Sequence, residues 1–423
     1  MIKSRFQSLY QFVLNISSFN WVLLGFLISY LLFFVRPIFF SAQVMQFFEY
    51  VPALDSIGLD LEAMLSYSDS WFITKQTPYI GNNLYPPLAS VLFTPLLSVE
   101  FSFAFRIVTL ASLLLYVSIT FVLPIITSRE KNVSHLVMLI FITGLFAYGF
   151  QFELERGQFN VIAASMSFFA IWLYHYHNRY RYLAYFLFTI SVQLKVYPFI
   201  FIVMFITDWH DWKNNIKRIL VLSTVNVALF TVLGPYVFFD FIRAIKAQVT
   251  VPFIWIGNHS IHSFVTLASN KASEHGWAWV NQFSGLVQLI LLAITGVLIF
   301  MIMRKAYQQK ENGFNSYLFL ALTIGALIIP SVSHDYKLSI LAAPVAVLFS
   351  NRSTFSEKDI RPRQRIIFIL LILILSASYS STLFSFTNKP FLLQNNFPAL
   401  FSILLAITGL SLMFTPSLNE KKS

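Results

Sequence analysis

Several short segments of the chain carry polar side chains where apolar sequence begins or ends. The first contains Asp60, in the run GLDLEAM of a long connection between two apolar stretches. A carboxylate in such a place can act as a general base that removes a proton from an attacking hydroxyl. An ordinary solvated acid is the plainer alternative, and Asp55 lies shortly before it as a second candidate base.

A second polar segment, ERGQFN, opens a predicted apolar span. Glu153, Arg156 and Asn160 are spaced three and four residues apart, which predicts that all three share one face of a helix. Arg156 and Gln158 would then face a polar cavity and grip an anionic or hydroxyl-rich ligand. The alternative is an ion pair and a cap at the start of a helix.

The third segment, QLKVYPF (193–199), places Lys195 inside an apolar region. An ammonium group within a bilayer costs ~2.5–3.5 kcal/mol on insertion scales and by default faces a cavity or a counter-ion. Lys195 is therefore a natural anchor for a phosphate carried by a lipid, unless its side chain reaches the outer interface instead. Tyr197 follows two residues later, where its ring could stack on a sugar.

Two histidine-containing runs form the fourth polar region. His259 and His262 are three residues apart, which could suit a metal site, but no acid near them in sequence completes one. Two surface histidines are the plainer interpretation. His334, beside Asp335 and Lys337, is a better candidate for contact with a phosphate or an acceptor. The two runs are NHSIHS (258–263) and SVSHDYK (331–337).

The composition indicates which elements position these residues. Hydrophobic residues make up 57% of the 423 and charged residues only 11%, unlike a soluble globular domain. A membrane-spanning helix needs roughly 20 mostly apolar residues, and about a dozen stretches approach that length. The sequence therefore predicts an all-α polytopic membrane protein, with one integral domain over 1–423. The predicted spans lie near 20–40, 103–127, 135–151, 160–176, 180–194, 196–207, 219–239, 282–303, 314–330, 337–350, 366–385 and 397–416.

The placement of basic residues predicts the orientation, because Lys and Arg accumulate in short cytoplasmic connections. Basic clusters occur in alternate connections from Lys3 to Lys422, so both termini are predicted to be cytoplasmic. The connection 41–102 then forms the first outer loop. Its proline-containing run 84–99 is predicted to be an interfacial or re-entrant element. The same asymmetry explains the net charge of +11 without a nucleic-acid partner.

Motifs absent from the sequence narrow the chemistry. The chain has no cysteine, hence no disulfide and no thiolate metal site. It also has no Gly-rich phosphate loop and no HExxH motif. The longest predicted inner connection, 351–365, is too short for a domain that binds ATP or a nucleotide sugar. A substrate must therefore arrive already activated, and a lipid carrier would deliver it to an outward-facing site.

Taken in order, these segments resemble a known family. Their order is similar to that in the polytopic glycosyltransferases of family 87, the mannosyltransferase-like and arabinofuranosyltransferase-like group of the GT-C superfamily. The resemblance extends from about residue 55 to 345, and GQxN followed by KxYP is its more specific part. The motifs are GLDLEAM (58–64), YPPL (85–88) with Pro95, GQFN (157–160), LKVYP (194–198), NHS (258–260) and SHDY (333–336).

The resemblance implies a GT-C-type bundle. The outward-facing site predicts a plasma (inner) membrane, and an endoplasmic-reticulum membrane with the site in the lumen would obey the same charge rule. The resemblance also implies transfer of a hexose such as mannose, or of arabinofuranose, from a polyprenyl-phosphate donor to an acceptor hydroxyl, with inversion. The acceptor would be a lipid or glycan at the outer leaflet. Asp60 matches the base in the first outer loop, with Asp55 as its rival. No metal is demanded, and a divalent cation stays open as a cofactor. The residues expected to bind the donor phosphate and substrate are Arg156, Gln158, Asn160, Lys195, Tyr197, Asn258, His259 and His334.

Two other classes of membrane protein fit some of these features. A transporter or flippase for a lipid-linked saccharide would also have many spans and buried charges, but the sequence shows no paired halves. A ligase or polymerase of lipid-linked saccharides would be expected to have its large outer loops late in the chain. Here the large acidic loop comes early, which favours the transferase.

Overall fold

The computed structural model describes residues 57–79, 81, 83–127, 135–251, 253–255, 257–308, 313–350, 366–367, 370–371 and 397–413. Within these residues the regular structure is helical, apart from one isolated antiparallel bridge between Asn258 and His334. The all-α prediction therefore holds for this part of the chain. Asp55, the predicted first span 20–40, the connection 351–365 and both termini lie outside the described residues.

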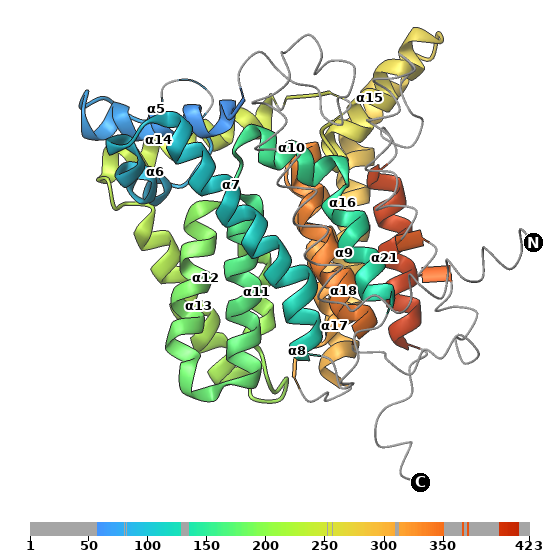
Figure 1. Cartoon of the computed structure of the whole chain (residues 1–423). Helices are drawn as coiled ribbons and strands as arrows, with labels where there is room; N and C mark the ends of the chain where they lie inside the picture. The colour runs from blue at the N-terminus through green and yellow to red at the C-terminus, as the bar shows by residue number, and fades with distance from the viewer. Residues whose placement is uncertain are drawn as a thin grey trace, which may run out of the picture.

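The helices divide into an upright bundle and a group that lies across one end of it (Figure 1). The end group contains α5 (Leu59–Phe72), α6 (Pro87–Phe93) and α14 (Pro235–Thr250), with α10 (Tyr148–Arg156) beside them. The other helices are α7 (Phe101–Val117), α8 (Leu123–Thr127), α9 (His135–Leu145), α11 (Asn160–Tyr176), α12 (Arg181–Leu194), α13 (Trp212–Leu229), α15 (Ile261–Glu274), α16 (Val280–Gln308), α17 (Ser316–Ile328), α18 (Ala342–Ser350) and α21 (Phe397–Met413).

Shorter helical segments connect these helices. A π-helical turn, η3 (Ser118–Val122), joins α7 to α8. The 3-10 segments are η2 (Thr94–Ser98), η4 (Asn178–Tyr180), η5 (Tyr197–Phe205) and η6 (Asp335–Leu341).

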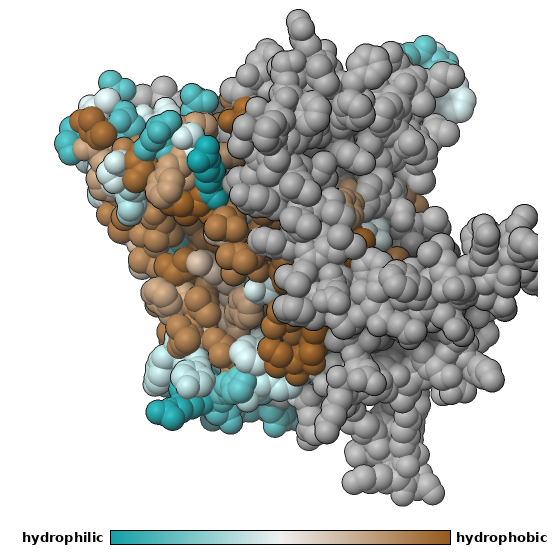
Figure 2. Space-filling model, viewed as in Figure 1, coloured by the Kyte–Doolittle hydropathy of each residue, from teal (hydrophilic) through white to brown (hydrophobic). Residues whose placement is uncertain are grey.

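The apolar surface agrees with a membrane protein. Hydrophobic side chains cover the side of the molecule formed by α11 to α13, between two hydrophilic ends (Figure 2). Among the described residues, Phe101–Thr127 and Val280–Gln308 are long and apolar enough to cross a bilayer. The bent pair Val137–Leu145 and Gly149–Arg156 adds a third if it counts as one span. Only 11% of the apolar window of α16 is buried, so this helix presents its side chains outward. The count of about twelve spans stays a prediction.

One predicted span was wrong in its boundaries. The apolar stretch 219–239 is divided between α13, which ends at Leu229, and α14, which begins at Pro235. Gly234 has φ +98°, a backbone conformation that glycine adopts readily. Pro235 follows at the first helical position, where its missing N–H costs nothing. The chain can therefore turn here and lay α14 across the end of the bundle.

The connection 41–102 is largely helical where it is described. Its run 84–99 forms α6 and η2, which together are shorter than a membrane span. They pack on α5, and together these segments bury a small core against α7, α11 and α12, here called the α5–α6 core. A second and much larger core occupies the upright bundle. The buried residues of the α5–α6 core are Leu61, Met64, Ala89, Phe93, Val108, Phe159, Ala163 and Leu194.

Candidate active site

Asp60 lies in the first turn of α5, close to the positive end of the helix dipole, which favours a carboxylate there. The start of α5 is fixed by Gly58, whose N–H donates to the carbonyl of Glu155 at 2.7 Å. Gly58 has φ +84°, and a Cβ on it would lie 2.8 Å from the Phe105 ring. Only glycine therefore allows the approach that brings Asp60 to the end of α10.

Gln158 connects Asp60 to the opposite wall of the site. Its Nε2 donates to Asp60 Oδ2 at 2.7 Å and to the Tyr85 hydroxyl at 3.1 Å. Its Oε1 accepts a hydrogen bond from Lys195 Nζ at 2.8 Å. Because one amide bonds to both groups, the carboxylate and the ammonium are held at a fixed separation, although Gln158 and Asp60 are 98 residues apart.

Lys195 directly follows the last residue of α12, where the backbone becomes extended. Its Nζ lies 4.3 Å from the centre of the Tyr85 ring and 4.6 Å from that of Phe159. These aromatic faces stabilise a cation. Burial lowers the pKa of Lys195 to about 8, while the negative charges of Asp60 and Glu153 act to raise it. The ammonium is thus the main form at neutral pH, but it loses its proton at a lower pH than the ammonium of a surface lysine does.

A turn at Gly157 places the GQFN residues. Helix α10 ends at Arg156, Gly157 has φ +64°, and α11 begins at Asn160. The prediction that Glu153, Arg156 and Asn160 share one helical face was therefore wrong. Glu153 is instead buried, and its carboxylate accepts hydrogen bonds from the Val161 N–H and the Ser339 hydroxyl.

Two further contacts order the same region. The Tyr197 hydroxyl donates to the carbonyl of Asn160 at 2.9 Å, which joins η5 to the start of α11. Arg156 lies 3.5 Å from Glu155 and 4.9 Å from the centre of the Phe152 ring.

The two histidine-containing runs meet in one seam. The isolated bridge pairs Asn258 with His334, and the Asn258 side chain accepts from the Ser333 N–H at 2.9 Å. Buried beside it, His259 Nε2 lies 2.5 Å from Asp335 Oδ1. Within the described residues no group of three or more His, Asp or Glu is arranged to hold a metal ion.

His334 has a defined tautomer in this seam. Trp255 Nε1 donates to His334 Nδ1 at 2.9 Å. An indole N–H is only a donor, so the Nδ1 atom must accept and the neutral ring carries its proton on Nε2. Burial lowers the pKa of His334 to about 3, with nearby His259 and cationic side chains acting in the same direction. His334 is thus a neutral hydrogen-bond donor at physiological pH.

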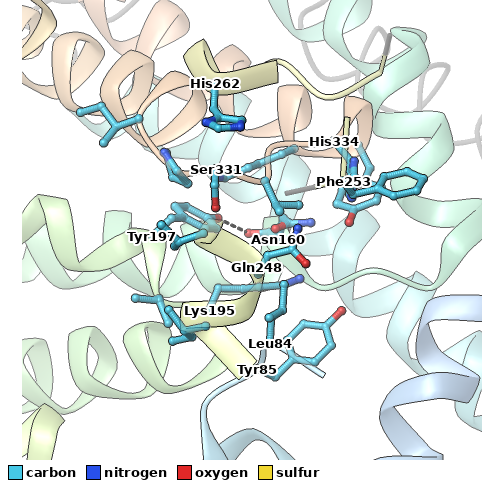
Figure 3. A pocket seen from close by; sticks show the side chains of 18 of the residues that line it. Leu84, Tyr85, Asn160, Lys195, Tyr197, Gln248, Phe253, His262, Ser331 and His334 are labelled. Atoms are coloured by element: carbon cyan, nitrogen blue, oxygen red, sulfur yellow. Dashed lines mark hydrogen bonds between the residues drawn. The ribbon is translucent and has the colours of Figure 1, made fainter. Parts of the chain in front are cut away.

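These elements surround a cavity of about 1180 Å³. Tyr85 and Lys195 lie toward one end of it and His262 toward the other (Figure 3). The lining combines polar and aromatic side chains with apolar ones, and α14 and α16 supply residues of both kinds. The cavity residues discussed below are Asp60, Tyr67, Tyr85, Gln158, Asn160, Lys195, Tyr197, Ile245, Gln248, Val249, Gln288, Leu292, His334, Tyr336 and Lys337.

The structure brings most of the predicted site residues together. Six of them line this cavity, whereas Arg156, Asn258 and His259 do not, so their contact with a substrate stays a prediction. The residues that line the cavity are Asp60, Gln158, Asn160, Lys195, Tyr197 and His334. Sequence reasoning missed Tyr67, Gln248 and Gln288, because nothing in their local sequence distinguishes them from other interfacial polar residues, and it named Tyr336 only as part of the SHDY motif.

A comparison with protein families agrees with this arrangement. The model of glycosyltransferase family 87 matches residues 83–330, more than half of the chain. The chain therefore belongs to glycosyltransferase family 87. A search among curated proteins finds no match.

Proposed function

We propose that this membrane glycosyltransferase moves a sugar from a polyprenyl-phosphate donor to a hydroxyl of a lipid or glycan at the outer leaflet of the plasma membrane. The observation that carries the proposal is the Asp60–Gln158–Lys195 chain on the wall of one large cavity. It presents a carboxylate for proton removal and an ammonium for a leaving anion. Family membership favours this reaction over lipid transport.

In the proposed reaction, Asp60 removes the proton of the acceptor hydroxyl while its oxygen attacks the anomeric carbon. The bond between that carbon and the phosphate oxygen breaks, and the electron pair leaves with the phosphate. The cationic side of the cavity stabilises this developing charge. Attack from the face opposite the leaving group inverts the anomeric carbon and yields a glycoside and a polyprenyl phosphate.

The two kinds of lining residue suit the two parts of the donor. Tyr85, Tyr67 and Tyr197 supply aromatic faces and hydroxyls for a sugar. Ile245, Val249 and Leu292 are among the apolar lining residues, which suit a prenyl chain. The identity of the sugar, a hexose or arabinofuranose, is left to experiment.

The proposal is tested by reconstituting the full chain in proteoliposomes with polyprenyl-phosphate-linked mannose, glucose or arabinose and membrane acceptors. We expect transfer to be lost in Asp60→Asn. Glu62→Gln is the matched control, because Glu62 is exposed on the same helix and lies outside the cavity. Asp55→Asn tests the rival base. Movement of a lipid-linked saccharide across the vesicle without any transfer would contradict the proposal.

A further inference from the structure

Lys337 is the second lysine that lines the cavity. It lies in η6 and only 5% of it is exposed. Its Nζ is 4.5 Å from the centre of the Tyr197 ring. A buried ammonium is costly in an apolar environment, so its retention here requires a physical reason.

Part of the reason that a lysine is retained here is structural. Lys337 Nζ donates to the carbonyl of Ala326 at 2.7 Å, in the last turn of α17. The residue four positions after Ala326 is Pro330, which has no N–H to donate. Lys337 therefore completes the end of α17, and a cation is favourable at a helix C-terminus. This contact uses one of three N–H donors, and a neutral donor could make it equally well.

The end of α17 and the Tyr197 ring favour the charge of Lys337 but do not neutralise it. Within the part of the chain that the structure describes, no carboxylate lies within salt-bridge distance of it. The neighbouring Asp335 is hydrogen-bonded to His259 instead. Lys195, by contrast, is joined through Gln158 to Asp60. Burial without a carboxylate partner disfavours the ammonium form of a lysine, and an anionic ligand in the cavity would favour it again.

We propose that Lys337, together with Lys195, binds the phosphate of the lipid donor. This assignment rests on the proposed function. It identifies a residue that binds the phosphate within the same active site. When the glycosyl bond breaks, the phosphodiester becomes a phosphomonoester and gains negative charge. A second cation in the cavity then stabilises the product side of the reaction more than the substrate side.

The test measures binding of three probes to the purified full chain in nanodiscs: a polyprenyl monophosphate, the polyprenol of equal length, and inorganic phosphate. We expect Lys337→Met to weaken binding of the polyprenyl monophosphate at least about tenfold and to leave polyprenol binding unchanged. Lys337→Arg keeps the charge and should stay within about threefold of wild type. Lys271→Met is the control, because Lys271 is exposed on α15 outside the cavity.

Melting temperatures, measured on the same proteins, separate the anion role from a purely structural one. If Lys337 only completes α17, Lys337→Met lowers the melting temperature and binds the lipid phosphate as wild type does, which overturns the proposal. Displacement of the lipid by inorganic phosphate, with no contribution from the prenyl chain, would also overturn it. If wild type itself prefers the phosphate lipid no more than polyprenol, the donor class in the proposed function is wrong. If wild type binds the lipid phosphate and transfers sugar but Lys337→Met binds equally well, only the role of Lys337 is wrong.

Discussion

Replacing Gln158 by Met should strongly reduce transfer while keeping the volume of the side chain. The substitution removes the bonds to Asp60 at 2.7 Å and from Lys195 at 2.8 Å. Hydrogen bonds to charged groups contribute ~1.5–3 kcal/mol each, so the loss approaches ~3–6 kcal/mol if nothing replaces them. Water in the cavity can replace part of the lost hydrogen bonding. We therefore expect a loss of transition-state stabilisation at the lower end of this range, ~3 kcal/mol. Since each 1.36 kcal/mol is tenfold in rate, kcat/KM should fall ~10²-fold.

The assay is the initial rate of sugar transfer in proteoliposomes at several donor concentrations. Gln193→Met is the matched control, because Gln193 is equally buried in α12 but bonds to Asn226, outside the cavity. That control should lower the melting temperature and leave kcat/KM within about threefold of wild type. A Gln158→Met enzyme with more than a third of wild-type activity would refute the reasoning.

Three other measurements test the site. Burial lowers the pKa of Lys195 to about 8, so kcat/KM should fall as the pH rises through that value and its ammonium is lost; a flat profile from about pH 7 to 9 would contradict this. Gly157→Ala places a Cβ 2.9 Å from that of Leu61 at φ +64°, and should reduce stability by ~1–3 kcal/mol in thermal melting; an unchanged melting temperature would argue against a strained turn. His259→Ala leaves Asp335 buried without this partner. The free energy of unfolding should therefore fall by ~3 kcal/mol or more. Chemical unfolding can measure this against a substitution of an exposed histidine, His275→Ala.

Local sequence predicts the helices better than it predicts the turns between them. Apolar runs placed α11, α12, α17 and α21 within a few residues of their observed ends, because each run is bounded by polar or turn-forming residues. The break after α12 was also visible from Lys195 and Pro198. The division of 219–239 was missed, although a Gly234–Pro235 pair is a signal for a turn in its own right.

For the candidate site, too, local sequence predicts the individual residues better than the turns that bring them together. Asp60, Gln158 and Lys195 are individually notable in the sequence, and resemblance to a family suggested that they act together. Their hydrogen bonds depend on two glycine turns that bring α5 against the end of α10, and no periodic pattern encodes that approach. Arg156 illustrates the opposite error, since its spacing to Asn160 is meaningful only in a continuous helix and Gly157 ends that helix.

The small size of the α5–α6 core has a consequence for how the protein loses activity. Asp60 is carried by a helix whose buried contacts belong to this small cluster, whereas the upright bundle has its own larger core. Units with few buried apolar contacts open at lower free energy than the global transition. We therefore expect heat to inactivate the enzyme while α11 and α17 are still folded. In hydrogen exchange, the amides of α5 and α6 should exchange together and before those of the bundle, so the useful temperature of the enzyme is set by its smallest cooperative unit.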